Sequence, residues 1–242
     1  MSKPMAVTLP CVLLLLDVWP LRRITNTAGW RRPASEKLPL LGLAFADGVI
    51  TLVAQRDAAK MLDDLTVGAK LANIFHAFAW YLQKTFVPTD LIVFYPHPLG
   101  TLHPALVVAQ VGIFITITTI VLRYCRRRPH LLFGWGWFVI SLLPVIGILQ
   151  VGGQAYADRY SYVPHLGLFV AIVWEIDARI GSNRIPRVLA GLVTVVALVS
   201  CAVLTRSQIE HWKNSETLWN HALKITPDSG LAHAHMSDVR LE

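Results

Sequence analysis

An acid, an arginine and three tyrosines lie close together between two long apolar runs. They belong to the segment 150–167, which reads QVGGQAYADRYSYVPHLG. A charged side chain near hydrocarbon is unfavourable unless it faces a cavity or a partner, so this turn is a candidate functional site. The alternative is that Asp158 and Arg159 are interface residues between two helices, with the tyrosines forming an aromatic belt. The pattern alone leaves both readings open.

The composition indicates an integral membrane protein. Hydrophobic residues make up 54% of the 242 and charged residues only 15%, which is too apolar for a soluble domain of this length. The net charge of +7 would suit a nucleic-acid partner. However, the arginines at 22–32 and 123–128 stand in short clusters beside apolar runs, where topology signals lie. We therefore expect membrane lipid, and no nucleic acid, as a partner.

The three cysteines, Cys11, Cys125 and Cys201, are far apart in the chain. Their spacing matches neither a disulfide framework nor a metal-binding motif. We expect them to be packing residues and predict no metal site. The sequence does not indicate a cofactor.

The expected fold class is all-α, a polytopic membrane helical bundle of about six spans. A helix needs about 20 predominantly apolar residues to cross a bilayer. The first apolar run is short, but Asp17, Trp19 and Pro20 replace the small residues that a signal peptidase needs, so we interpret it as a short or partial span. The six expected spans are residues 5–19, 38–55, 104–122, 130–149, 163–178 and 188–205.

A further helix is expected to lie on the membrane surface. Between residues 70 and 86, apolar side chains recur at steps of three and four, which is typical of an amphipathic helix. Polar residues such as Asn73, His76 and Lys84 interrupt any apolar run of spanning length, which favours a surface position. The proline-rich segment that follows, up to residue 103, is predicted to be a loop.

The arginine-rich connections predict the orientation. Residues 20–37, 123–129 and 179–187 hold more than half of the 22 lysines and arginines. If the amphipathic helix stays on the surface, all three connections share one face, which the positive-inside rule makes cytoplasmic. The turn at residues 158–159 and the tail after residue 205 are then extracytoplasmic. If residues 70–86 crossed the membrane, the first arginine cluster would oppose the other two.

The tail has a different character. An amphipathic helix over residues 211–226 is stopped by Pro227, and a second helix begins near Leu231. This ending is similar to the close of a tetratricopeptide (TPR) unit, although such repeats need about three neighbours to be stable. A single amphipathic helix lying on the membrane is the alternative. We therefore predict a membrane domain at 1–205 and an extracytoplasmic tail with an incomplete TPR at 206–242.

Four segments, in this order and spacing, resemble the membrane half of the transmembrane and tetratricopeptide-repeat proteins, the TMTC-like protein O-mannosyltransferases, especially their bacterial relatives. The third of these segments is similar to the family pattern acid-Arg-x-x-Tyr-x-Pro-x-x-Gly, which matches Asp158 to Gly167. The match extends over essentially the whole chain. The four segments are residues 2–21, 84–98, 144–167 and 212–218.

The resemblance implies a GT-C glycosyltransferase that transfers a sugar, mannose in this family, from a polyprenyl or dolichyl phosphate to an acceptor protein's hydroxyls on the extracytoplasmic side. A guanidinium suits the phosphate leaving group because it is planar and always charged. We therefore expect Arg159 to contact the donor phosphate, with Lys3 second. Tyr160 or Tyr162 would donate hydrogen bonds, and Asp158 would orient Arg159. Alternatively, Lys3 is a flexible terminal residue and the tyrosines only anchor the interface.

The chain departs from the family at the catalytic base. In GT-C enzymes this base is an acidic residue in the first extracytoplasmic loop, whereas this sequence resembles the family only from a later helix onward. Asp17 lies near the predicted cytoplasmic end of its span and is not a credible substitute, so the catalytic residue is unknown. We expect a fragment, truncated at both ends, without transferase activity of its own. A non-catalytic membrane anchor or scaffold that presents repeats to protein partners is the alternative; a transporter is less favoured, because no repeated halves appear.

Overall fold

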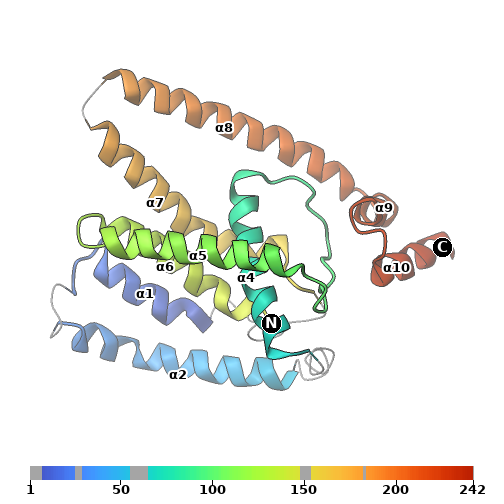
Figure 1. Ribbon diagram of the computed structural model, residues 1–242, viewed down its shortest axis with the longest axis horizontal. Coiled ribbons are helices and arrows are strands. Elements are labelled where there is room, and N and C mark those ends of the chain that lie inside the picture. The colour runs from blue at the N-terminus through green and yellow to red at the C-terminus, as the bar shows by residue number, and fades with distance from the viewer. Residues whose placement is uncertain (1–6, 25–28, 55–64, 148–153, 182–183, 242) are drawn as a thin grey trace. The chain divides into compact units, whose positions relative to one another are not determined.

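The computed structural model describes residues 7–24, 29–54, 65–147, 154–181 and 184–241. The structure is 78% helix, and no strand occurs in these ranges, which confirms the all-α prediction. The chain forms two compact units, one of Met1–Leu82 with His97–Glu175 and one of Gln83–Pro96 with Ile176–Glu242. The α-helices (Figure 1) are α1 (Leu9–Val18), α2 (Arg31–Ala54), α4 (Val67–Phe86), α5 (Pro104–Tyr124), α6 (Pro129–Leu142), α7 (Tyr162–Ile180), α8 (Arg184–His211), α9 (Ser215–Ile225) and α10 (Gly230–Leu241).

Prolines set several of the helix ends. Both α5 and α6 begin with a proline, Pro104 and Pro129, because the first helical position needs no N–H partner and favours the fixed φ of proline. The ring nitrogen Nδ1 of His103 also accepts a hydrogen bond from the backbone N–H of Ala105 at 3.3 Å. After α6, Pro144 lies in the short 3-10 helix η2 (Leu143–Val145). The observed starts of α5 and α6 lie within one residue of the starts predicted from the sequence, 104 and 130.

Two of the described helices, α5 and α8, are long and apolar enough to cross a membrane, judged by length and composition. Two others, α1 and α6, are apolar but shorter. In α2 the first two turns carry Arg31, Arg32 and Glu36, and α7 ends in charged residues. The structure is therefore compatible with a membrane protein, while the six-span arrangement stays a prediction.

The first unit is organised around α6, which packs beside α1 and α5. Helix α4 crosses α5 steeply rather than running alongside it (Figure 1). One face of α4 is buried in the common core, so the predicted amphipathic helix is present, and its position relative to a bilayer stays a prediction. The buried core residues are Ala77, Phe78, Tyr81, Val121, Trp135, Phe138, Leu142, Val145, Ile146 and Leu168.

Helices α6 and α7 contact each other backbone to backbone at two glycines. A Cβ atom on Gly134 would lie 2.4 Å from both the carbonyl oxygen of Gly167 and the Cβ of Ala171. A Cβ on Gly167 would lie 2.6 Å from the Cβ of Trp137. Real atoms do not approach so closely, so both positions require glycine.

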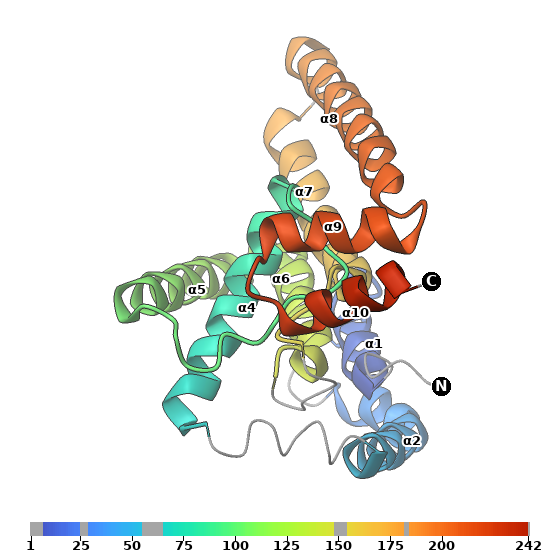
Figure 2. The same cartoon turned by 90° about the vertical axis from the view of Figure 1, so that its right-hand side faces the viewer.

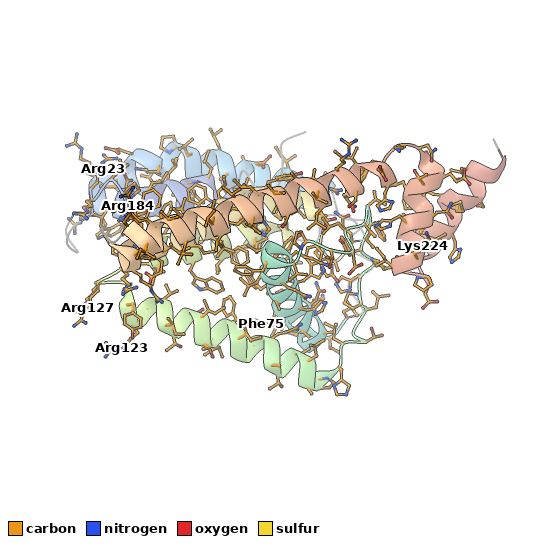
Figure 3. All side chains as sticks on the ribbon, turned by 90° about the horizontal axis from the view of Figure 1, so that it is seen from above. Arg23, Phe75, Arg123, Arg127, Arg184 and Lys224 are labelled. Carbon is orange, nitrogen blue, oxygen red and sulfur yellow. The ribbon has the colours of Figure 1, made fainter. Side chains whose placement is uncertain are left out.

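One end of the first unit gathers the first two arginine-rich connections, and we call it the arginine end. The Trp19 ring, just after α1, lies 5.1 Å from Phe133 near the start of α6 and 5.4 Å from Trp174 near the end of α7. Arg23, Arg123 and Arg127 accordingly lie toward the same end (Figure 3). The two connections therefore gather at one end of the first unit, which is compatible with the predicted common face. Its cellular compartment stays a prediction.

The second unit contains α8, the helix pair α9 and α10, and the segment 83–96. No residue of α8 is buried. Helices α9 and α10 lie side by side (Figure 2). The small residues Ala222 and Ala232 are both buried in this unit.

Candidate functional site

The turn singled out from the sequence, residues 154–162, lies just before α7. It contains the 3-10 helix η3 (Asp158–Tyr160), preceded by Ala157 in an extended conformation. Helix α6 begins at the arginine end, and α6 with η2 covers residues 129–145, or about 25 Å at 1.5 Å per residue. The turn belongs to the opposite end of the first unit, because α7 runs from the turn to the arginine end, where Trp174 lies beside Trp19 and Glu175 beside His130.

A buried tyrosine fixes the backbone of this turn. The Tyr81 hydroxyl donates to the carbonyl oxygen of Ala157 at 3.0 Å and accepts from its N–H at 3.1 Å. Tyr81 is fully buried in the core of the first unit. Because both bonds join α4 to the residue before Asp158, the start of η3 is held on a rigid element.

Aromatic rings pack between the turn and α4. The Tyr156 ring stacks on Trp80 of α4, with centroids 4.5 Å apart, and lies 5.9 Å from the His76 ring. The side-chain amide of Gln154 donates to the Tyr160 hydroxyl at 3.2 Å. These contacts bury much of Tyr156 and Tyr160 against α4 and the core.

Arg159 is the exposed cation of the turn. Its guanidinium carbon lies 5.1 Å from the centre of the Tyr160 ring. The guanidinium donors therefore remain accessible to a ligand, while the backbone beneath them is fixed through Ala157.

The other predicted site residues have different surroundings. Tyr162 begins α7 and is 77% exposed, whereas Tyr160 packs against the core and Asp158 is half-buried. The carbonyl of Asp158 accepts from the Ser161 hydroxyl at 2.6 Å, which closes the turn. Lys3 lies outside the described residues. The other four predicted site residues lie within five positions of the chain, so the sequence already implied that they are close together. They are Asp158, Arg159, Tyr160 and Tyr162.

The sequence did not identify the residues of α4 that support the turn. His76 and Trp80 are four residues apart, as are Ala77 and Tyr81, so each pair lies on one helical face. The amphipathic pattern was therefore visible, but no sequence signal connected that face to a turn more than seventy residues later. The partner of α4 was decided by folding.

His76 adds a polar contact between α4 and α5. Its Nδ1 lies 3.0 Å from the side-chain nitrogen of Gln110. Burial lowers the pKa of His76, and the contact with Gln110 opposes this only partly. The neutral imidazole is therefore favoured at neutral pH.

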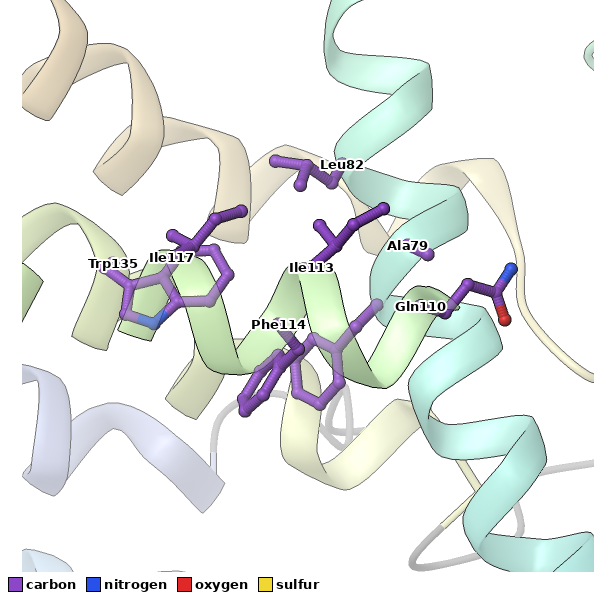
Figure 4. A pocket seen from close by; sticks show the side chains of 8 residues that line it. Ala79, Leu82, Gln110, Ile113, Phe114, Ile117 and Trp135 are labelled. Atoms are coloured by element: carbon purple, nitrogen blue, oxygen red, sulfur yellow. The ribbon is translucent and has the colours of Figure 1, made fainter. Parts of the chain in front are cut away.

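An apolar pocket between α4, α5 and α6 is too small for a substrate (Figure 4). It has room for about one water molecule. Gln110 is its main polar residue, and the indole N–H of the lining residue Trp135 donates to the Thr118 hydroxyl at 3.1 Å. The pocket is lined by Phe78, Ala79, Leu82, Gln110, Ile113, Phe114, Ile117 and Trp135.

Asp17 is occupied by two cations at the arginine end. Its buried carboxylate accepts hydrogen bonds from Lys37 and, at 2.9 Å, from Arg23. A carboxylate held in this way is not available as a catalytic base. Within the described ranges, no group of three or more His, Cys, Asp or Glu side chains could hold a metal ion.

Comparison of the chain with protein-family models, with curated proteins and with solved structures yields no match.

Proposed function

We propose that this chain provides the donor-phosphate-binding part of a membrane-embedded glycosyltransferase. The enzyme would transfer a sugar from a polyprenyl or dolichyl phosphate to protein hydroxyls on the extracytoplasmic side. The observation that carries this proposal is the exposed Arg159 guanidinium on a turn whose backbone is fixed by Tyr81. The nature of the sugar, mannose, rests on the sequence resemblance.

The chemistry of the turn suits a phosphate leaving group. As the bond between sugar and phosphate breaks, negative charge develops on the phosphate oxygens, and a cation placed there beforehand stabilises the transition state. Arg159 would supply that charge and two parallel N–H donors. The exposed Tyr162 is close in sequence and would donate a further hydrogen bond from its hydroxyl.

The catalytic base remains unassigned in this proposal. Asp17, the acid of the first apolar helix, is paired with Lys37 and Arg23. We therefore expect the purified 242-residue chain to bind a polyprenyl phosphate without transferring sugar. Sugar transfer from polyprenyl-phosphate-mannose by this chain alone would refute that part of the proposal.

Binding of polyprenyl phosphate to the detergent-solubilised chain tests the role of Arg159. Because a hydrogen bond to a charged group contributes about 1.5–3 kcal/mol, Arg159→Ala should weaken binding by about 10- to 150-fold. Arg159→Lys keeps the charge without the planar pair of donors, so it should lose less affinity for polyprenyl phosphate than Arg159→Ala does. The matched control is Arg206→Ala, which removes another exposed arginine. Equal affinity of the Arg159→Ala variant and the unchanged chain would remove Arg159 from the site.

The tail favours a second candidate, a scaffold that presents helical repeats to protein partners. Asn214 and Thr217 form a capping box at the start of α9. In the α9–α10 pair, the rings of Trp219 and His235 stack with centroids 4.6 Å apart. A pair of helices with small buried residues is the form a first TPR unit would take. Unchanged lipid-phosphate binding by Arg159→Ala, together with intact capture of a protein partner, would favour this candidate.

A further inference from the structure

Exposed arginines surround the arginine end. Arg23 and Arg32 pair with Glu36 at 2.7 and 3.6 Å, and five more arginines are exposed beside them. Arg22 follows α1, Arg31 begins α2, and Arg123, Arg126 and Arg127 lie at the end of α5 and just after it. The two sequence clusters are about a hundred residues apart. Trp19 brings them together, because its ring contacts both His130 and Phe133 at the start of α6.

The carboxylates described at this end already have other partners. Asp17 accepts from Lys37 and Arg23, and Glu36 accepts from Arg23 at 2.7 Å. Glu175 near the end of α7 accepts from Arg128 and lies 3.0 Å from His130. Within the described residues, none of the five exposed arginines forms an ion pair with these acids. Counted over the described residues, this surface therefore carries more positive charge than its acids balance.

Exposed aromatic and apolar side chains lie beside these arginines. Trp30 precedes Arg31 and is 55% exposed, and Tyr124 follows Arg123 and is 45% exposed. Leu21, beside Arg22, is also exposed. Tryptophan and tyrosine next to basic residues are typical of the level where lipid headgroups meet hydrocarbon.

We propose that the arginine end binds the headgroups of anionic phospholipids in the membrane leaflet that it faces. This inference rests on the membrane location in the proposed function, but not on Arg159 or on sugar transfer. Basic residues beside a membrane are attracted to anionic lipids by about a factor of five each at moderate salt. The occupant is a lipid rather than a soluble anion, because the exposed apolar and aromatic side chains of Leu21, Trp30 and Tyr124 adjoin the arginines in the chain.

The test is the lipid selectivity of the full chain reconstituted in phosphatidylcholine vesicles. Spin-labelled phosphatidylglycerol and spin-labelled phosphatidylcholine are added in trace amounts, and the protein-restricted fraction of each is measured by electron paramagnetic resonance. We expect about fivefold preference for phosphatidylglycerol. The triple change Arg123→Gln, Arg126→Gln and Arg127→Gln should reduce that preference by more than half.

Two control variants separate the surface from net charge and from misfolding. The first control is a triple variant that removes the same charge from the second unit, Arg206→Gln with Lys213→Gln and Lys224→Gln. It should leave the preference for phosphatidylglycerol unchanged. Lysine in place of the three arginines should retain it. In 1 M salt the screening length falls to about 3 Å, so the preference of the unchanged chain should disappear without any mutation.

The possible outcomes distinguish this inference from the proposed function. Extraction at alkaline pH first shows whether the chain is inserted in the vesicles. An inserted chain that binds polyprenyl phosphate through Arg159 but has no phosphatidylglycerol preference overturns the lipid inference alone. A chain that is not inserted overturns both. An equal loss of preference in the two glutamine triple variants also overturns the lipid inference.

Discussion

Helices α6 and α8 are both strongly apolar, yet they differ in how far each is buried. Seven residues of α6, including Trp135 and Phe138, are buried in the first unit. None of the residues of α8 is buried, and Val193 and Val196 are 69% and 65% exposed. Apolar composition alone therefore does not decide whether a helix packs against protein.

The difference lies in the shapes of the side chains. Helix α6 alternates large rings with glycines, and Gly134 lets α7 approach its backbone while Trp135 and Phe138 fill the core. Helix α8 carries valines, leucines and alanines and has no Phe, Tyr or Trp. A smooth aliphatic surface of this length, exposed to water, would drive association. We therefore expect α8 to be surrounded by lipid.

The largest expected effect on stability comes from removing the buried carboxylate of Asp17. This side chain joins α1 to Lys37 of α2 in the first unit. Asp17→Ala leaves the buried Lys37 with the longer contact to Glu36 at 3.7 Å, which should lower the free energy of unfolding by about 3–5 kcal/mol. Denaturant unfolding in detergent measures the change. The exposed Glu210→Ala should shift stability by less than about 0.5 kcal/mol. If Asp17→Ala unfolds at the same denaturant concentration as the unchanged chain, the ion pair does not stabilise this unit.

A charge in the middle of α8 tests its assignment to lipid. Val196→Arg should reduce membrane insertion of the α8 segment by about 2.5–3.5 kcal/mol, because the guanidinium would lie near the bilayer centre. Glycosylation mapping in microsomes gives the inserted fraction. Ser207→Arg, beyond the predicted span, should insert as well as the unchanged segment. Equal insertion of the two variants would mean that α8 does not cross the membrane.

A single methyl group tests the close contact of α6. Gly134→Ala places a Cβ 2.4 Å from two atoms of α7, so overpacking should lower the free energy of unfolding by about 1–3 kcal/mol. Gly112 in α5 and Gly191 in α8 have open space at the same position. Alanine at either control site should be neutral or slightly stabilising, because alanine favours helix. Thermal unfolding that does not distinguish Gly134→Ala from these controls would contradict the contact.

The smallest expected effect is a pH dependence at the end of α8. The rings of His211 and His221 stack 3.8 Å apart, with Lys224 also close and Asp90 opposing them. Burial, followed by the charge of His211, lowers the pKa of His221 below its usual 6.5. The unfolded chain therefore binds the proton more tightly, so stability is full above about pH 6.5 and decreases as the pH falls below it.

Hydrogen exchange of α9 between pH 7.5 and 5.0 checks this effect. Rates are first corrected for the intrinsic pH dependence of exchange. Protection of α9 should decrease on acidification, and His221→Gln should make the decrease smaller. His103→Gln, at the start of α5 in the first unit, is the histidine control. A decrease of the same size in all three chains would exclude the His211–His221 pair as its cause.

The sequence predicted the helices better than it predicted their contacts. The runs expected at 104–122 and 163–178 correspond to α5 and α7, because prolines, charges and apolar length are local signals. The polar turn at 158–162 was also found from its charged and aromatic residues. The support that α4 gives it through Tyr81 was not found, because that hydrogen bond joins residues 76 positions apart.

The sequence by itself determined the all-α class, helix starts close to Pro104 and Pro129, and the charged and aromatic residues of the turn at 158–162. Composition and local stereochemistry act within a few residues, so they can be read directly along the chain. The tertiary structure alone decided that Trp19 joins two arginine clusters, that Gly134 meets Gly167, and that Asp17 is held by Lys37. Those contacts depend on which helical faces meet, and many arrangements of the same amphipathic helices would satisfy the sequence pattern equally well.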